Sequence, residues 1–274
     1  MPDVNKHTPS IITLTTDFGL KDEYAGVMKG VILSINPEAV IVDISHDIPA
    51  QDIMAAGLML KAAYGYFPGK TIHLSVVDPG VGSKRRIIGA KFKGQIFIAP
   101  DNGLLPQVFG DDSPDILISV KNSDFFLSDI SDTFHGRDVF APVAANLSKG
   151  IGLLALGPKI EKSSLKELPD QNPEIKNGKL SGSIISIDHF GNLITNIKAE
   201  DLNRFIEKGK NARIFIKGRI INGISRSYQK ADPTGFCAIM ASRAYLEIAL
   251  FKGNAAKELG IEKGETVEVS TVQL

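Results

Sequence analysis

Short apolar runs alternate, in the first half of the chain, with longer segments whose apolar residues recur three and four positions apart. The apolar runs IITLTT (11–16), VIVDIS (40–45) and IHLSVV (72–77) have the length of buried strands. The segments between them, 23–35 and 52–67, have the helical spacing that places apolar side chains on one face. This alternation predicts parallel strands joined by crossover helices, which together form an α/β layer.

Two further apolar runs, 86–92 and 95–100, are separated only by Lys93 and Gly94. A connection this short predicts a β-hairpin, and a hairpin within a parallel sheet makes the sheet mixed. Further along, the segment 161–178 is rich in Pro, Lys, Glu and Asn and has no long apolar run. We interpret that segment as a linker.

Beyond the linker the pattern changes to short strands with few helices. The strand candidates are SGSIISID, NLITNI, ARIFIK, CAIMAS, YLEIAL and TVEVSTV. Closely spaced short strands are typical of a compact antiparallel β-domain. We therefore expect an α/β fold with an N-terminal mixed-sheet layered domain over residues 1–160, the linker, and a smaller antiparallel β-barrel-like C-terminal domain over residues 179–274.

Composition and charge exclude several classes of protein. The 274 residues include 31 basic and 31 acidic side chains, so no net charge attracts a nucleic acid or an anionic lipid surface. The single cysteine, Cys237, excludes an internal disulfide, and no Cys-x-x-Cys or His-Glu-x-x-His spacing offers a zinc site. No signal peptide and no apolar run of membrane-spanning length is present. We expect a cytoplasmic protein that binds neither membranes nor nucleic acid.

Polar residues gather where the predicted strands of the first half end. They are Asp17, then Asp43, His46 and Asp47, then Asp78, and finally Asp101 and Asn102. In open α/β sheets ligands bind beyond the carboxyl ends of the strands, so these positions are candidates for a site. Each acid taken alone also fits an ordinary turn or a helix cap. Four acidic turns at successive strand ends favour a site.

Familiar phosphate motifs are approached but not completed. GYFPGKT (65–71) is one residue shorter than a P-loop and precedes a strand, where a P-loop precedes a helix. GVGSKR (80–85) has an arginine in place of the third glycine of a dinucleotide fingerprint. No Gly-x-Ser-x-Gly elbow occurs. We expect neither ATP nor NAD, and no other cofactor or metal is implied.

His135 is the strongest candidate among the histidines. It lies in FHGRD, beside Arg137 and Asp138 and before a helical run. A histidine near its ordinary pKa, an acid and an arginine can together activate water, although Arg137 and Asp138 fit helix caps equally well. Of the other histidines, His7 lies in an N-terminal segment that we expect to be mobile, and His73 lies inside an apolar strand where we expect a structural role. His46 and His189 lie in predicted loops, where a functional and a structural role stay equally open.

Five motifs, in order over nearly the whole chain, carry a resemblance to a known family. TTDFG, VVDPGVGSKRR, APDNGLL, TFHGRDVFAP and IDHFGNLITNI resemble those of the S-adenosyl-L-methionine (SAM) hydrolases, also called hydroxide adenosyltransferases. The same superfamily contains fluorinating and chlorinating enzymes. The resemblance implies an α/β N-terminal domain, a smaller β-barrel-like C-terminal domain, and attack of water or hydroxide on ribose C5′ of SAM that releases adenosine and methionine.

The resemblance also implies roles for individual residues. The catalytic acid, arginine and histidine are Asp78, Arg85 and His135, and Asp17 is the acid that accepts hydrogen bonds from both ribose hydroxyls. The remaining substrate contacts are Asp188 for the methionine ammonium, Asn192 for the adenine edge, and Ser242 with Arg243 for the methionine carboxylate.

Phe190 and Phe236 are candidates to stack on the substrate, with a role in the core as the alternative for each. The family places its site between the N-terminal domain of one subunit and the C-terminal domain of its neighbour. We therefore expect a homotrimer.

Departures from the halogenating branch favour hydrolysis. The fluorinating enzymes carry an extra loop after the acidic-turn strand, whereas the hairpin 86–100 leaves no room for one, and the halogenases lack the set Asp78, Arg85 and His135. Two alternatives stay open. One is a halide-dependent adenosyltransferase that makes 5′-halogenated adenosine. The other is a non-catalytic protein that binds adenosine or SAM and gives those three residues no task.

Overall fold

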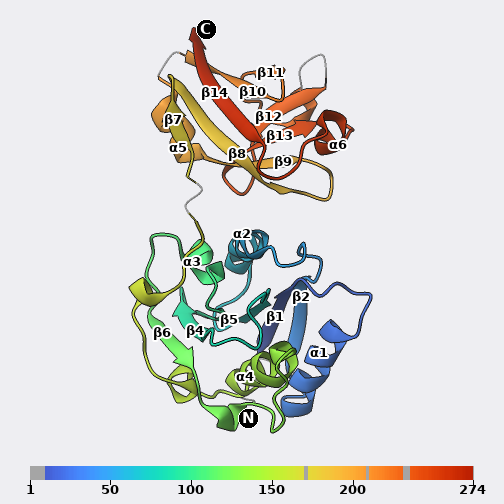
Figure 1. Cartoon of the computed structure of the whole chain (residues 1–274), viewed down its shortest axis with the longest axis vertical. Coiled ribbons are helices and arrows are strands. Elements are labelled where there is room, and N and C mark those ends of the chain that lie inside the picture. Colours follow the sequence, from blue (N-terminus) through green and yellow to red (C-terminus); the bar gives the residue numbers. More distant parts are fainter. Residues whose placement is uncertain (1–9, 170–171, 208–209, 231–234, 274) are drawn as a thin grey trace, which may run out of the picture. The chain divides into compact units, whose positions relative to one another are not determined.

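The computed structural model describes residues 10–169, 172–207, 210–230 and 235–273, so His7 lies outside the described residues. The chain divides after Leu168 into two compact units, which we call the N-terminal unit and the C-terminal unit (Figure 1). The segment expected to be a linker, 161–178, contains the 3₁₀ turn Lys162–Ser164 and the short strand β7 (Glu174–Lys176). Among the described residues, none of the helices has the length and apolar character needed to cross a bilayer.

A six-stranded sheet forms the centre of the N-terminal unit, in the order β2-β1-β3-β5-β4-β6. The strands β2, β1, β3 and β5 run parallel, whereas β4 is antiparallel to both of its neighbours. The predicted mixed sheet is therefore confirmed. The strands are β1 (Ile11–Thr16), β2 (Val40–Ser45), β3 (Ile72–Val76), β4 (Ile87–Phe92), β5 (Gln95–Pro100) and β6 (Ile116–Val120).

The predicted hairpin is the connection between β4 and β5. Phe92 pairs with Gln95, and the two residues between them, Lys93 and Gly94, have φ angles of 47° and 77°. Two positive φ angles in a two-residue loop match the twist of the flanking strands. The hairpin reverses the chain so that the start of β4 and the end of β5 lie opposite each other, with Ile87 paired to Pro100.

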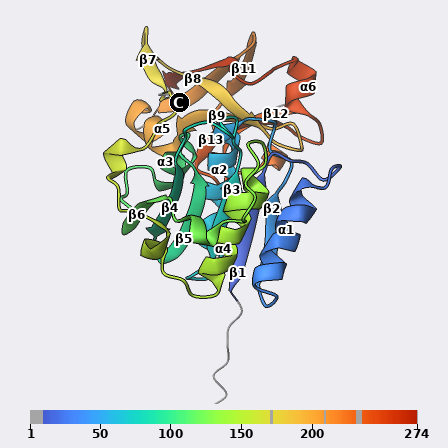
Figure 2. The same cartoon turned by 60° about the horizontal axis from the view of Figure 1, so that its bottom comes forward.

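Helices cover both faces of this sheet, and the core is divided accordingly. α1 (Tyr24–Ile35) and α4 (Ala141–Ser148) pack together on one face (Figure 2), over side chains such as Ile12, Leu14 and Leu74. α2 (Ile53–Ala63) and α3 (Leu104–Phe109) pack together on the other, over side chains such as Phe97 and Ala99. Full burial of one such large apolar side chain contributes about 1.5–3 kcal/mol.

The helical run predicted after His135 begins differently from an α-helix. Residues Gly136–Phe140 form a π-helical turn, and α4 starts only at Ala141. Pro142 has no N–H and cannot donate to the carbonyl of Asp138 four residues earlier. That carbonyl instead accepts a hydrogen bond of 2.9 Å from the N–H of Leu127. The proline therefore accounts for the wider turn directly after His135.

The C-terminal unit is an antiparallel sheet in the order β11-β10-β14-β8-β9-β13-β12, with β7 paired to β8. Ser225, after β11, donates its N–H to Ala238 on β12 at 2.7 Å, so the two ends of the sheet meet and it nearly closes. The predicted barrel-like fold is confirmed. Its other elements are β8 (Lys179–Ile187), β9 (Leu193–Lys198), α5 (Ala199–Phe205), β10 (Lys210–Ile216), β11 (Arg219–Asn222), β12 (Phe236–Met240), β13 (Tyr245–Leu250), α6 (Ala255–Leu259) and β14 (Thr266–Gln273).

Candidate active site

A tight loop after β3 brings Asp78 and Arg85 together. Pro79 restricts Asp78 to an extended backbone, and the chain then turns through hydrogen bonds from Val81 N–H to the Asp78 carbonyl (3.2 Å) and from Ser83 N–H to the Gly80 carbonyl (3.1 Å). The Ser83 hydroxyl donates to the same Gly80 carbonyl at 2.6 Å. The loop therefore doubles back, and the Arg85 side chain reaches the Asp78 carboxylate.

Asp78 and Arg85 form a buried ion pair. Nε of Arg85 lies 2.7 and 2.6 Å from the two carboxylate oxygens of Asp78, and a terminal guanidinium nitrogen contacts one of them as well. Each side chain is only 5% exposed. A buried charge without its partner is costly, so neither residue can be replaced alone without leaving an uncompensated charge.

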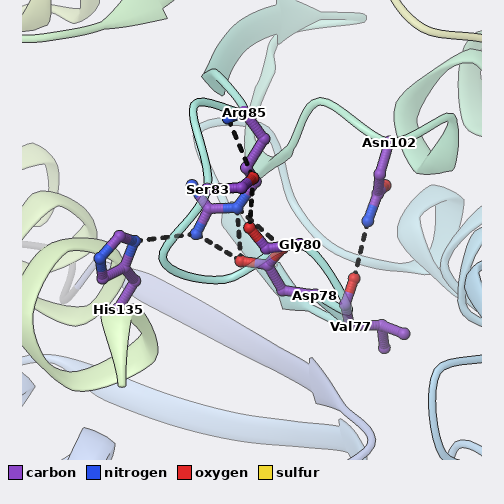
Figure 3. A network of polar contacts seen from close by, with 7 residues as sticks. All are labelled: Val77, Asp78, Gly80, Ser83, Arg85, Asn102 and His135. Atoms are coloured by element: carbon purple, nitrogen blue, oxygen red, sulfur yellow. Dashed lines mark hydrogen bonds and ion pairs between the residues drawn. The ribbon is translucent and has the colours of Figure 1, made fainter. Parts of the chain in front are cut away.

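His135 joins this pair through Arg85. A terminal nitrogen of Arg85 lies 3.0 Å from Nδ1 of His135 (Figure 3). A guanidinium only donates hydrogen bonds, so Nδ1 must be the acceptor and the neutral ring carries its proton on Nε2. Burial, and next the charge of Arg85, lower the pKa of His135 below its ordinary value. Both effects favour the neutral imidazole that this hydrogen bond requires.

A cavity of about 470 Å³ opens beside Asp78 and His135. Asp17 also lines it, and one carboxylate oxygen of Asp17 accepts a hydrogen bond of 2.8 Å from the N–H of Gln51. Arg85 lies behind Asp78 and His135 and lines a second cavity, of about 380 Å³, together with Arg86. The first cavity thus presents two carboxylates and an imidazole.

An aromatic cluster that we did not predict forms part of the first cavity. Phe18, Tyr24 and Phe134 line it, with ring centroids 5.2–5.9 Å apart. Phe18 and Phe134 directly neighbour Asp17 and His135 in the sequence, which is the signal that could have identified them. Tyr24 begins α1, and its position at the site depends on the fold.

Arg137 and Asp138, which were candidates together with His135, have contacts that stabilise the fold. Asp138 is fully buried, pairs with Nε of Arg137 at 2.5 Å and accepts the N–H of Ser131 at 2.8 Å. Neither residue caps the helix with its side chain. Asp138 therefore holds the loop before His135 onto the π-helical turn.

Two further histidines are buried within the N-terminal unit. His73 contacts the Thr13 hydroxyl at 2.8 Å and the Gln95 side-chain oxygen at 3.1 Å, as expected of a structural residue. His46 contacts the Thr16 hydroxyl at 2.8 Å and lies 3.0 Å from Asp43. These contacts indicate a structural role for His46 as well.

The C-terminal unit brings three of the predicted substrate residues into one turn. Asp188 accepts hydrogen bonds from the N–H groups of Phe190 (2.9 Å) and Asn192 (2.8 Å) and from the Asn192 side-chain amide (2.9 Å). Gly191 completes the turn at a φ of 82°. Phe190 is 71% exposed, which leaves its ring free to stack. His189 packs against it, with ring centroids 5.6 Å apart.

The last three candidates separate into surface and core. Ser242 and Arg243 are exposed in the turn between β12 and β13. Phe236 is 1% exposed, packs in the core of the C-terminal unit and lies under the Arg219 guanidinium at 4.3 Å. Phe236 therefore has the role in the core that was the alternative to stacking on the substrate. Among the described residues, no group of three or more His, Cys, Asp or Glu is arranged to hold a metal ion.

The chain matches two family models in succession. Residues 12–157 match the SAM hydroxide adenosyltransferase N-terminal domain, and residues 182–268 match the SAM hydroxide adenosyltransferase C-terminal domain.

Individual proteins are similar over almost their whole length. A protein from Methanocaldococcus jannaschii named (R)-S-adenosyl-L-methionine hydrolase is 35% identical, covering 94% of this chain and 95% of its own. A fluorinase from Actinoplanes sp. (strain N902-109) is 27% identical, covering 95% and 97%. The crystal structure of an uncharacterized conserved protein from Thermotoga maritima superposes with a TM-score of 0.85 at 35% identity, covering 94% and 99%. Both units thus match in order, and the chain belongs to the SAM hydroxide adenosyltransferase family.

Proposed function

We propose that this protein hydrolyses S-adenosyl-L-methionine to adenosine and L-methionine. One observation carries the proposal: Arg85 joins Asp78 and His135 through hydrogen bonds, and both of these residues line a cavity that also holds Asp17. The printed name of the hydrolase relative supports the same reaction. In a protein that only binds adenosine or SAM, Asp78, Arg85 and His135 would have no chemical task.

The reaction is a substitution at ribose C5′. A C5′–O bond forms to the attacking water, the C5′–S bond breaks with its electron pair left on sulfur, and one proton leaves the attacking oxygen. Methionine departs as a neutral thioether and needs no acid to protonate it. The site therefore has to aim the oxygen nucleophile and accept its proton.

We assign the three roles from the hydrogen bonds. His135 already carries a proton on Nε2 and offers Nδ1 to Arg85, so it donates a hydrogen bond that aims the nucleophile. Asp78 lines the cavity and accepts the proton only transiently, because a protonated Asp78 would leave the Arg85 charge uncompensated, and the proton passes on to solvent. Arg85 holds both groups from behind, and its permanent charge favours hydroxide over water.

Substrate recognition is divided between the two units. Asp17 accepts hydrogen bonds from both ribose hydroxyls, as suits a carboxylate with several lone pairs. In the C-terminal unit, Asp188 takes the methionine ammonium and Asn192 the adenine edge. The remaining residues are Phe190 as a stacking platform and Ser242 with Arg243 for the methionine carboxylate.

We propose a cytoplasmic homotrimer in which one subunit supplies the Asp17 half of each site and its neighbour supplies the Asp188 half. Sedimentation analysis tests the oligomeric state. Co-expression of Asp17→Ala and Asp188→Ala chains tests the sharing: mixed trimers should contain some sites with both intact halves and regain part of the activity. A site built within one chain would gain nothing from mixing.

The first experiment is chromatography of purified protein incubated with SAM in halide-free buffer, beside a His135→Ala control. We expect adenosine and methionine only with the intact protein. We also expect the His135→Ala variant to lose most turnover while it keeps most of its affinity for SAM. Unchanged turnover in that variant would remove His135 from the chemistry.

The sulfonium of SAM is a chiral centre, and the hydrolase relative is named for the (R) epimer. We propose the same preference here. A SAM sample that contains both sulfur epimers, followed by NMR during the reaction, should lose the (R) form first. Equal consumption of both forms would contradict this preference.

Halide-dependent transfer is the second candidate, because a fluorinase is 27% identical over 95% of this chain. Addition of chloride or fluoride to the same assay would then produce a 5′-halogenated adenosine. We expect the product to remain adenosine. Survival of SAM with and without halide would favour a protein that binds its ligand without catalysis, or a nucleophile other than water and halide.

A further inference from the structure

The turn that follows β5 contacts both ends of the loop 78–85. This turn consists of Asp101 and Asn102, two of the polar residues at strand ends to which the reaction gives no task. Neither residue lines the cavity that holds Asp17 and His135. Both are nevertheless close to the active-site loop, because β5 and β3 are neighbouring parallel strands and end at the same edge of the sheet.

Asn102 holds the beginning of the loop. Its side-chain amide donates a hydrogen bond of 2.8 Å to the carbonyl of Val77 (Figure 3), while its side-chain oxygen accepts the N–H of Leu104 at 3.3 Å. The Val77 carbonyl belongs to the planar peptide group that leads into Asp78. The hydrogen bond from Asn102 therefore fixes the peptide plane from which the Asp78 side chain projects.

Asp101 holds the end of the loop. Its side chain is 3% exposed and pairs with Arg86, whose Nε and terminal nitrogen lie 2.8 and 2.6 Å from one carboxylate oxygen. The N–H of Asp101 donates to the Arg86 carbonyl at 3.0 Å, and the second carboxylate oxygen accepts the N–H of Lys166 at 2.9 Å. Arg86 directly follows Arg85, so Asp101 fixes the backbone from which Arg85 projects.

The Asp78–Arg85 ion pair joins the two ends of the loop directly. Three contacts therefore form a closed ring of interactions. Asn102 donates to the Val77 carbonyl, Arg85 pairs with Asp78, and Arg86 pairs with Asp101, which precedes Asn102 in the chain. We infer that Asp101 and Asn102 form a positioning clamp, which holds both ends of the loop so that Arg85 reaches Asp78 and His135 together. This inference rests on the proposed function, because it assigns the clamp a part in the same reaction.

Asn102→Asp tests the clamp with almost no change in size. The substitution replaces the donor that faces the Val77 carbonyl with a second acceptor. A displacement of about 1 Å at a reacting group can cost 100-fold in rate, so we expect kcat to fall about 10- to 100-fold while KM for SAM changes less than about 3-fold.

Asn122 offers a matched control. Its side-chain amide donates to the Ala155 carbonyl at 3.1 Å and its side-chain oxygen accepts the N–H of Asp124 at 3.1 Å. These are the same two kinds of contact that Asn102 makes, but Asn122 lines neither of the two cavities. Asn122→Asp should therefore retain the kcat of the intact protein. If both substitutions lower kcat equally, the effect is general to such turns and the clamp is refuted.

Two readouts distinguish positioning from loss of stability. The ¹⁵N resonance of His135 Nδ1 reports its hydrogen bond from Arg85, and it should shift in Asn102→Asp but not in Asn122→Asp. In an Arg85→Ala background, Asn102→Asp should lower the residual kcat by less than about 2-fold, because residues that act as a unit are not additive. An unchanged resonance, or an undiminished effect in that background, would overturn the inference.

Asp101→Asn provides a second test at the other end of the loop, should Asn102→Asp fail to fold. It keeps the shape but removes the charge that holds Arg86, and the same shift of the His135 resonance is expected. The NMR arm needs no turnover. An intact protein that leaves SAM untouched would therefore refute the proposed reaction, while the resonances would still decide whether the clamp exists.

Discussion

Gly82 lies directly against the backbone of Asp132: a Cβ atom at Gly82 would stand 2.4 Å from the Asp132 carbonyl oxygen. The loop that carries Asp78 and Arg85 therefore rests on the segment that leads into His135. Gly82 also has a φ of 75°, in the left-handed region that other residues rarely adopt. Contact and conformation both require glycine at this point.

Gly82→Ala should push the two segments apart and stretch the hydrogen bond between Arg85 and His135. We expect kcat to fall at least about tenfold, as for other misplaced catalytic groups. Gly94→Ala is the control, since Gly94 has a φ of 77° but no atom within 4 Å of its Cβ position. It should show only the backbone strain, about 1–2 kcal/mol in the free energy of unfolding. A kcat equal in both variants would mean that the contact with Asp132 does not matter.

The pKa of His135 should depend on Arg85. Burial and then Arg85 lower it below 6.5, while Asp78, Asp138 and Asp132 act in the opposite direction. Neutral His135, the form that accepts from Arg85, is lost as the pH falls through this pKa, so turnover should fall on the acid side. In Arg85→Gln the charge is gone and the pKa should rise, which an NMR titration of the imidazole measures. An unmoved titration midpoint would show that Arg85 is not the cause.

His73 makes the fold sensitive to acid. Its burial lowers its pKa from 6.5 to about 4, so below pH 6.5 the unfolded chain binds a proton that the folded chain does not. Stability should therefore fall as the pH drops from 6.5 toward 4, by up to about 3 kcal/mol from this residue. Urea unfolding at both pH values measures the loss. His73→Gln, which cannot titrate, should lose less, and an equal loss would exclude His73 as the source.

Asp17→Asn should chiefly weaken the binding of adenosine. The amide keeps one oxygen for the N–H of Gln51, which the Asp17 carboxylate accepts at 2.8 Å, but it cannot accept fully from both ribose hydroxyls. Hydrogen bonds to a charged group contribute about 1.5–3 kcal/mol each, so the Kd should rise at least about tenfold by calorimetry. Asp115→Asn, at an exposed position, is the control. An unaltered Kd would remove Asp17 from the ribose site.

The sequence pattern predicts the framework of the N-terminal unit closely. The runs 11–16 and 40–45 are β1 and β2, and the hairpin strands differ from prediction by a single residue. Buried strands appear as short continuous apolar runs and amphipathic helices as apolar residues three and four positions apart, so both can be recognised in the sequence. The short elements β6, β7, β11, α5 and α6 were missed, since five or so residues carry too little periodicity.

Residue types at strand ends predict where a site lies but not how its members connect. Asp78 and His135 are candidates by residue type and position, and Arg85 joins them through the family resemblance. The choice of Nδ1 as the acceptor follows only from the position of the Arg85 guanidinium. Asn102 looked like a turn former because its contact, the Val77 carbonyl, lies 25 residues away in the chain. Contacts across neighbouring strands of this kind depend on the assembled sheet.

In the π-helical turn after His135, backbone hydrogen bonds join residues five positions apart, whereas in an α-helix they join residues four positions apart. The turn therefore contains one extra residue. Removal of one residue from 136–140 would take out the extra residue of this turn, and each residue of an α-helix turns the chain by about 100° and advances it by about 1.5 Å. His135 would then swing around the axis of α4 and point away from the Arg85 guanidinium. The extra residue therefore sets the direction of the imidazole, and a single-codon deletion would misdirect it even though every side chain of the site is still encoded.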